Sequence, residues 1–290
     1  MSAKNNLKHT VIQLLKQDRL GSFATRHDRK QLILRFAEDL VNIGYKITDI
    51  HSLKLKHIQA VTKFWQDKHL SNATIKNRLS ALRQLASILR KPMLVPSNTE
   101  LNIGHRKYIS QINRAVINPN FEKITHPYLR ASLELQRLFG LRREESLKIK
   151  PHMADGGNEL KLQPSWCKGG RGRNIPIQTE EQRYWLDKAK EIAGQFRNSL
   201  IPQNKNYIQH RYYYDKQVQQ AGLKNLHGLR HAYAQRRYKE LTGWDAPING
   251  GPNSKQLAAE QKEIDYQAKM ILTEELGHSR ILIVAVYCGK

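Results

Sequence analysis

The sequence predicts a mainly α-helical protein with two domains. Most of the chain repeats apolar side chains every three or four residues, the spacing of an amphipathic helix. Alternation typical of β-strands occurs only between about residues 159 and 177. Residues 91–120 are rich in Pro, Asn and Gly and break the periodicity, which indicates a linker. A chain of 290 residues is long enough for two domains that each bury a core.

The first domain, at residues 1–116 with its linker, is expected to be a compact helical bundle without strands. Ser71 or Asn72 can cap the most regular helix, and Gly44 can end an earlier one. A short helix is also expected in the linker, at residues 107–116. The apolar patterns predict the main helices over residues 7–15, 26–43, 51–69 and 71–89.

One face of the last of these helices carries a row of cations. Lys76, Arg83 and Arg90 recur every seven residues and therefore share that face. A solvated row of charges would give the same pattern. On a chain this basic, a row that lies along DNA phosphates is at least as good an interpretation.

The second domain, at residues 117–290, is expected to be helical with one small antiparallel sheet. Residues 159–162 and the segment through Ile175 and Ile177 alternate, and the glycine-rich stretch 168–173 would form the hairpin tip. A polar, glycine-rich stretch at 244–252 is expected to be a surface loop. Helical patterns cover residues 128–141, 180–196, 207–221, 226–237 and 254–273.

Charge is the strongest property of the whole composition. The chain has 49 Lys and Arg against 25 Asp and Glu, a net charge of +24, and both halves carry the excess. Such an excess repels itself unless a polyanion offsets it, so nucleic acid is the expected partner. A merely soluble basic protein is the less favoured alternative because the excess is so large.

Cysteine spacing indicates a reducing compartment, and hydropathy gives no sign of a membrane segment. Cys167 and Cys288 are far apart, without CxxC pairing, which argues against a disulfide framework or a cysteine-rich zinc site. No apolar run approaches membrane-spanning length, and the N-terminus lacks a signal-peptide core. We therefore expect a cytoplasmic protein with access to the nucleoid and no membrane partner.

The second domain also carries a series of short polar motifs. The last is a tyrosine that follows an apolar run, nine residues after a histidine. In chain order the motifs are Gly140-Leu141-Arg142 with Glu145, then Lys168, then His227 with Arg230 and His231, then Leu276-Gly277-His278, and finally Tyr287.

Taken alone, each basic motif has a structural alternative. Arg142 beside Arg143 would equally be a solvated helix start. Lys168 lies near Arg171 and Arg173, so a hairpin that only binds phosphate would fit as well.

The histidines and the tyrosine have alternatives too. His227 and His231 are four residues apart, a spacing that also serves zinc. No Glu lies between them as in metalloprotease helices, and no third ligand is evident, so neither a metal nor another cofactor is expected. His278 alone would more often be a structural histidine. Tyr287 alone would more often be a half-buried packing residue.

Together and in this order, the motifs resemble the signature of the tyrosine recombinase (phage integrase) family, over about residues 120–290. The resemblance implies a helical core-binding (SAM-like) domain followed by an α-rich catalytic domain. It implies an integrase of a bacterial mobile element that cleaves and rejoins DNA through a 3′-phosphotyrosyl intermediate during integration or excision. The implied partners are double-stranded DNA, further copies of the chain (a tetramer on two DNA sites) and an accessory DNA-bending or directionality factor.

The chemistry explains why these residue types recur together. Tyr287 would be the nucleophile, and a phenol needs proton removal and charge stabilisation to attack a phosphodiester at neutral pH. Arg142 and Arg230 would clamp the non-bridging oxygens, whose negative charge grows in the transition state.

By the same resemblance, Lys168 would give a proton to the leaving 5′-oxygen and His227 would assist proton handling at the tyrosine. His278 would hydrogen-bond the scissile phosphate. Glu145 would brace the arginines, and His231 would pack or orient the others. The cations expected to contact DNA elsewhere are Lys76, Arg83, Arg90, Arg171 and Arg173.

Two features depart from the family pattern. The stretch between His231 and Leu276 is long, so the loop at 245–252 is an addition whose purpose the sequence leaves open. Only three residues follow Tyr287, whereas family members commonly extend into a segment that docks on a neighbouring protomer; we expect another contact between subunits. Two other functions remain open at this point: type IB topoisomerase-like relaxation of DNA, and a non-catalytic architectural role on DNA.

Overall fold

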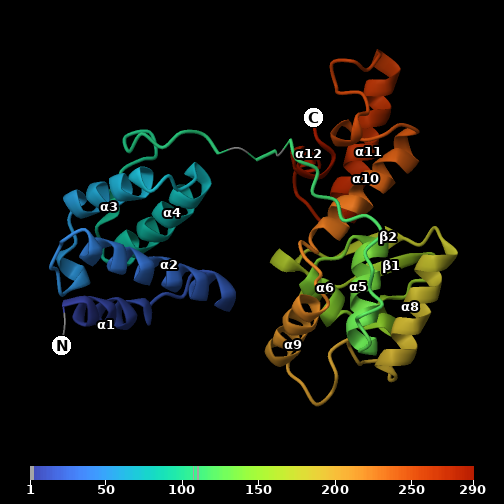
Figure 1. Ribbon diagram of the computed structural model, residues 1–290, viewed down its shortest axis with the longest axis horizontal. Coiled ribbons are helices and arrows are strands. Elements are labelled where there is room, and N and C mark those ends of the chain that lie inside the picture. The colour runs from blue at the N-terminus through green and yellow to red at the C-terminus, as the bar shows by residue number, and fades with distance from the viewer. Residues whose placement is uncertain (1–2, 107, 110) are drawn as a thin grey trace. The chain divides into compact units, whose positions relative to one another are not determined.

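The computed structural model describes residues 3–106, 108–109 and 111–290, and the chain divides into two compact units, Met1–Lys107 and Tyr108–Lys290 (Figure 1). Both units are built mainly of helices, and the described residues contain one two-stranded antiparallel sheet. The expected fold class is therefore confirmed. The division falls ahead of the expected boundary at 116/117. Asn113 and Val116 hydrogen-bond to Gln235 and Gly228 and therefore lie within the second unit.

The first unit contains the four expected main helices. Ser71 caps the last one, since its hydroxyl accepts a hydrogen bond from the amide of Thr74 at 3.2 Å. The third helix begins later than expected because a short 3-10 turn, η1 (Ile50–Ser52), precedes it. The helices are α1 (Ala3–Leu15), α2 (Phe23–Asn42), α3 (Leu55–Asp67) and α4 (Asn72–Ile88), followed by the 3-10 turn η2 (Pro92–Leu94).

A partly buried polar contact joins three of these helices to one another. Asp39 of α2 accepts hydrogen bonds from the Trp65 indole of α3 at 2.8 Å and from the Arg78 guanidinium of α4 at 3.1 Å. The guanidinium also lies over the Trp65 ring, 4.9 Å from its centre. The apolar faces of α1 to α4 form the core of the unit.

The described part of residues 107–116 contains none of the short helix expected there. Residues 107 and 110 lie outside the described residues, and the described part of the stretch is bent or extended. The amide of Val116 is engaged by the carbonyl of Gly228 at 3.0 Å, and the side chain of Asn113 accepts from the amide of Ala115 at 2.9 Å. These partners replace the bonds that a helix would have made within the segment.

The second unit places a small sheet beside a set of packed helices. The strands β1 (Glu159–Leu162) and β2 (Arg173–Pro176) pair antiparallel, with Leu162 opposite Arg173. The helices are α5 (Pro127–Phe139), α6 (Arg143–Lys148), α7 (Pro151–Ala154), α8 (Glu180–Ala193), α9 (Tyr207–Gln220), α10 (Gly228–Thr242), α11 (Ala259–Glu275) and α12 (Ala285–Cys288). The 3-10 turns are η3 (Pro164–Trp166), η4 (Lys168–Gly170), η5 (Pro247–Asn249) and η6 (Ile281–Ile283).

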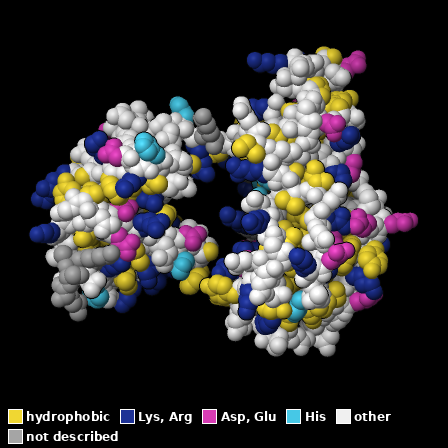
Figure 2. Space-filling model, in the orientation of Figure 1, with side chains coloured by type: hydrophobic (Ala, Val, Ile, Leu, Met, Phe, Trp, Pro, Cys, Tyr) yellow, Lys and Arg dark blue, Asp and Glu magenta, His cyan; other side chains and the backbone are white. Residues whose placement is uncertain are grey.

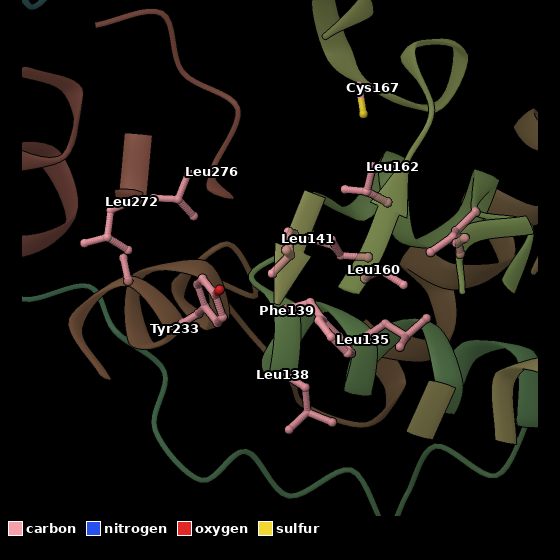
Figure 3. Close-up of a cluster of buried hydrophobic side chains, with 14 of the residues drawn as sticks. Leu135, Leu138, Phe139, Leu141, Leu160, Leu162, Cys167, Tyr233, Leu272 and Leu276 are labelled. Carbon is pink, nitrogen blue, oxygen red and sulfur yellow. The ribbon is translucent and has the colours of Figure 1, made fainter. Parts of the chain in front are cut away.

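The core of the second unit forms where α5, α10, α11 and β1 meet. Figure 3 shows Phe139 of α5, Leu160 of β1, Tyr233 of α10 and Leu272 of α11 within one cluster of buried side chains. Helix α10 packs against α5, α11 and α12. Because α10 is held on several sides, the side chains at its beginning have a fixed position.

Gly140 ends α5 in the left-handed conformation and approaches α10 closely. Its φ is +61°, and a Cβ there would lie 2.6 Å from Cδ1 of Tyr233. Glycine is therefore required for two reasons, the backbone conformation and the close approach of the helices.

This double requirement predicts that Gly140→Ala destabilises the protein more than a matched glycine change. Gly243 ends α10 with a φ of +85° and has open space around it, so Gly243→Ala tests the backbone cost alone. We expect Gly243→Ala to lower the free energy of unfolding by about 1 kcal/mol and Gly140→Ala by about 2–4 kcal/mol. Urea unfolding of both variants measures the difference, and equal losses would contradict a tight contact with Tyr233.

Candidate active site

The hydroxyl of Tyr287 lies between a histidine and an arginine. Tyr287 is in α12 and is 5% exposed. Its hydroxyl is 3.0 Å from Nε2 of His278 and accepts a hydrogen bond of 3.3 Å from Nε of Arg230. Three separate segments, the start of α10, the turn after α11 and α12, therefore bring the expected residues together around one oxygen.

Arg230 is the most deeply buried cation of this cluster. It is 1% exposed and donates to the carbonyl of Gly140 at 2.6 Å and to the carbonyl of Leu276. Burial lowers the pKa of Arg230 to about 10, although the nearby phenol of Tyr287 opposes this shift. The guanidinium therefore remains charged at neutral pH.

Arg142 binds the same carbonyl of Leu276. Its Nη1 donates to Oε1 of Glu145 at 2.7 Å, and its Nη2 donates to the carbonyl of Leu276 at 3.2 Å. Leu276 is the C-cap of α11, where the helix dipole leaves partial negative charge. The end of α11 thus holds Arg142 and Arg230 side by side, as the sequence motifs require.

Glu145 is a fully buried carboxylate bound to two guanidiniums. It accepts from Arg142 and, at 3.0 and 2.8 Å, from Arg173. Burial alone would raise the pKa of Glu145, but the hydrogen bonds and charge of Arg173, with the charge of Arg142, outweigh it and lower the pKa to about 2. The carboxylate is therefore ionised and braces the arginines.

Arg173 has a different place from the one expected. We expected it to contact DNA, but its side chain is 5% exposed and is engaged by Glu145 and by the carbonyl of Glu275 at 2.7 Å. Its Nη1 also lies 3.5 Å from the thiol of Cys167. We therefore reassign Arg173 to the interior of the cluster, as a brace of the site. Sequence spacing does not predict the burial of Arg173, because Arg171 and Arg173 occupy equivalent positions in the glycine-rich stretch 168–173.

The three histidines of the cluster have lowered pKa values. Burial and the guanidinium of Arg230 lower the pKa of His278 to about 4, and burial with neighbouring His227 lowers that of His231 to about 4. Partial loss of hydration, with the charge of Arg230, lowers the pKa of His227 as well. All three are neutral at pH 7 and can accept a proton.

The geometry assigns the tyrosine hydroxyl to His278 rather than to His227. The rings of His227 and Tyr287 are 6.3 Å apart, whereas His278 is within hydrogen-bond distance. His231 packs its ring against Tyr287 with centroids 4.8 Å apart. His227 and His231 touch edge to face at 5.6 Å, and the described residues contain no group of three side chains arranged to hold a metal ion.

The remaining candidate cations lie away from this cluster. Lys168 and Arg171 are exposed on the stretch that joins β1 to β2; within the described part of the chain, Lys168 makes no hydrogen bond or ion pair. Lys and Arg side chains are spread over the visible face of each unit (Figure 2).

Only two of the three cations expected in a row on α4 lie on that helix. Lys76 is half-buried on the helix, and Arg83 donates to the carbonyl of Pro96 at 2.7 Å, which holds the chain after α4. Arg90 is exposed but lies beyond the end of α4, with a φ of +57°. The seven-residue repeat therefore places Lys76 and Arg83 on one helix, and Arg90 points from the turn that follows.

Comparison with known proteins supports both units. The family model "Phage integrase, N-terminal" matches residues 4–93, and the family model "Integrase" matches residues 105–236, so together they span most of the chain. A comparison of the sequence with curated proteins finds no match. No helix among the described residues has the length and apolar character needed to cross a membrane.

Solved structures share the fold at low sequence identity. A lambda integrase dimer bound to a COC′ core site is 17% identical, with a TM-score of 0.61, and the match covers 97% of this chain and 76% of that chain. The XerH site-specific recombinase bound to palindromic difH substrate is 17% identical, with a TM-score of 0.56 and coverage of 97% and 80%. The Tn1549 transposon integrase in complex with transposon right end DNA is 15% identical, with a TM-score of 0.53 and coverage of 99% and 94%.

The lowered pKa of Glu145 predicts that the free energy of unfolding depends on pH. A carboxyl whose pKa falls from 4.5 to about 2 on folding contributes about 3 kcal/mol to the free energy of unfolding above about pH 5. This contribution is lost as the pH falls toward 2, because the unfolded state then binds the proton first. We expect Glu145→Gln to be much less stable than the natural chain at pH 7 and to approach it as the pH falls. Urea unfolding between about pH 3 and 7 measures this; a difference independent of pH would refute the ionised brace.

Proposed function

The chain belongs to the tyrosine recombinase (phage integrase) family, and we propose that it is a site-specific DNA recombinase that integrates or excises a mobile element. The observation that carries this proposal is the Tyr287 hydroxyl, held between the charged Arg230 and the neutral His278. A phenol in hydrogen-bond contact with a proton acceptor and a cation is equipped to become a nucleophile.

In the cleavage step, Oη of Tyr287 attacks the scissile phosphorus and the bond from phosphorus to the 5′-oxygen breaks. The phenolic proton passes to Nε2 of His278, which is the acceptor nearest to the hydroxyl. Lys168 is proposed to give a proton to the leaving 5′-oxygen. It is exposed on the stretch between the strands, so it would have to move with the hairpin onto bound DNA.

Arg142 and Arg230 are proposed to stabilise the added negative charge on the non-bridging oxygens. Both guanidiniums are fixed before DNA binds, by Glu145 and by the end of α11. Donors that are already oriented need no rearrangement when charge develops, and one such donor contributes about 3–4 kcal/mol to transition-state stabilisation. Arg142 is the more accessible of the two, with 22% of its side chain exposed.

The product is a 3′-phosphotyrosyl bond and a free 5′-hydroxyl. Because the phosphodiester is exchanged rather than hydrolysed, a 5′-hydroxyl from another strand can attack the link and release Tyr287. Joining to a different strand gives recombination. His227 would then assist proton movement, and His231 would keep the Tyr287 ring in place.

The proposed partner is double-stranded DNA, bound by several copies of the chain. Lambda integrase has been solved as a dimer on a core site and as a tetramer on a Holliday junction. We propose a tetramer on two DNA sites here as well, with an accessory DNA-bending or directionality factor and action at the nucleoid in the cytoplasm. In the first unit, Lys76 and Arg90 are proposed to contact phosphates, and Arg171 is proposed to do so in the second.

The central test is covalent trapping of the chain on DNA. The protein is incubated with element-end DNA that carries a nick beside the cleavage site, and a denaturing gel reports the protein–DNA band. We expect the band to vanish in Tyr287→Phe with unchanged DNA affinity, because only the nucleophilic oxygen is lost. Tyr266→Phe is the matched control, since Tyr266 is a half-exposed tyrosine on α11 outside the cluster.

The outcomes separate the alternative functions. A band that survives Tyr287→Phe means that another tyrosine attacks. Tight binding without a band on element-end DNA favours an architectural role. A band accompanied only by relaxed circles, without recombined sites, favours a topoisomerase-like enzyme.

The histidine geometry predicts how cleavage depends on pH. His278 must be neutral to accept the proton, so single-turnover cleavage should slow as the pH falls toward the pKa of His278, about 4 in the DNA-free protein. A bound phosphate favours the protonated imidazole and would move this acid limb upward. We expect His278→Gln to cleave about 10²- to 10⁴-fold more slowly and to lose the acid limb. The limb should persist in His227→Gln; the reverse pattern would make His227 the proton acceptor.

A further inference from the structure

Three side-chain amides form a closed hydrogen-bonded cluster behind the nucleophile. They are Asn113, Gln235 and Asn249, called the amide cluster below. Asn113 and Gln235 bond to each other in both directions, at 2.9 and 3.3 Å. Asn249 accepts from Asn113 at 2.6 Å and donates to Gln235 at 3.1 Å. The three residues come from three separate segments of the second unit.

Gln235 connects this cluster to the nucleophile itself. Gln235 is 4% exposed on α10, and its Nε2 also donates to the backbone carbonyl of Tyr287 at 2.9 Å. Both of its N–H groups and both lone pairs of its carbonyl oxygen are thereby used. A buried amide with every group satisfied has one defined orientation, and here that orientation fixes the backbone of Tyr287.

The two outer amides are carried by segments that pack closely around α10 and α12. Asn113 precedes Val116, whose amide binds Gly228 at 3.0 Å, and a Cβ on Gly228 would lie only 2.3 Å from the carbonyl oxygen of Arg114. Asn249 ends the turn η5, which contacts α12. A Cβ on Gly289, two residues after the nucleophile, would lie 2.8 Å from the amide nitrogen of Ile248.

We infer that Asn113, Gln235 and Asn249 are positioning residues that hold the Tyr287 backbone, and so keep its hydroxyl between Arg230 and His278 of the same chain. The inference rests on the proposed function of Tyr287 as the nucleophile. It assigns a role to the added loop at 245–252, because that loop supplies Asn249 and the Ile248 backbone against which Gly289 packs. Removal of Asn113 leaves one buried N–H of Gln235 without an acceptor, and removal of Asn249 takes away one of the two hydrogen bonds to its carbonyl oxygen. In either case the amide loses its single defined orientation and can turn away from the Tyr287 carbonyl.

The test uses Asn113→Ala and Asn249→Ala, which truncate exposed residues and should leave the fold intact. Asn253→Ala is the matched control. Asn253 follows the added loop, and among the described residues its side chain hydrogen-bonds to the amide of its near neighbour Lys255 and to no member of the amide cluster. Thermal unfolding of all three variants checks that they remain folded.

The first measurement needs no DNA. Cys288 is 0% exposed and adjoins Tyr287, and Cys167 is the only other cysteine, so a Cys167→Ser background reports Cys288 alone. We expect a soluble thiol reagent to label Cys288 about tenfold faster in Asn113→Ala and Asn249→Ala, the equivalent of one lost hydrogen bond. Labelling in Asn253→Ala should match the background chain.

The second measurement is covalent complex formation with the natural cysteines in place. At saturating nicked element-end DNA, we expect the rate constant to fall about tenfold in both cluster variants, with unchanged DNA affinity. Gln235→Glu should also be slow, since a carboxylate has no N–H to donate to the Tyr287 carbonyl.

The results distinguish the inference from the function on which it rests. Labelling and cleavage equal to those of Asn253→Ala overturn the inference. Faster labelling with unchanged cleavage also overturns it, because the cluster would then hold α12 without positioning the nucleophile. Faster labelling in the cluster variants, with no covalent complex even in the natural chain, would instead reject Tyr287 as the nucleophile.

Discussion

The site depends on the hydrogen bonds that its arginines donate to the backbone carbonyls at the C-terminal end of α11. The carbonyl of Leu276 accepts from both Arg142 and Arg230, and the neighbouring carbonyl of Glu275 accepts from Arg173. Three like charges would repel one another without such a partner. The partial negative charge at a helix C-terminus offsets part of that repulsion at a fixed point in space.

The position of α11 is itself fixed by buried polar contacts with α10. The hydroxyl of Tyr233 donates to Glu275 at 2.7 Å, and Arg237 binds the same carboxylate at 3.1 Å. Nearer the other end, the hydroxyl of Tyr238 donates to Asp265 at 2.6 Å. The helix that supplies Arg230 and the helix end that orients it therefore form one rigid pair.

The sequence predicted most of the fold because the apolar spacing of its helices is regular. Apolar spacing located α1 to α4 and α5, and Gly140 marked the end of α5 correctly. It failed in the described part of residues 107–116, where local composition allowed a helix but the amide of Val116 bonds instead to Gly228, a contact distant in sequence.

The motifs predicted which residues form the site but not the contacts that these residues make. Order and spacing named the side chains around Tyr287, but they could not tell which histidine would lie nearest to the hydroxyl. They also did not separate Arg171 from Arg173, since burial on a short hairpin depends on the helix end opposite. Nor did any pattern reveal Gln235, because its role comes from two amides far away along the chain.

The balance of charge inside the site has a consequence for the protein without its partner. Three guanidiniums, Arg142, Arg173 and Arg230, face a single buried carboxylate, that of Glu145. This cluster is thus short of negative charge. An anion that enters between them completes the electrostatics of the fold itself. The substrate phosphate would then supply the missing counter-charge, and its binding would stabilise the folded state.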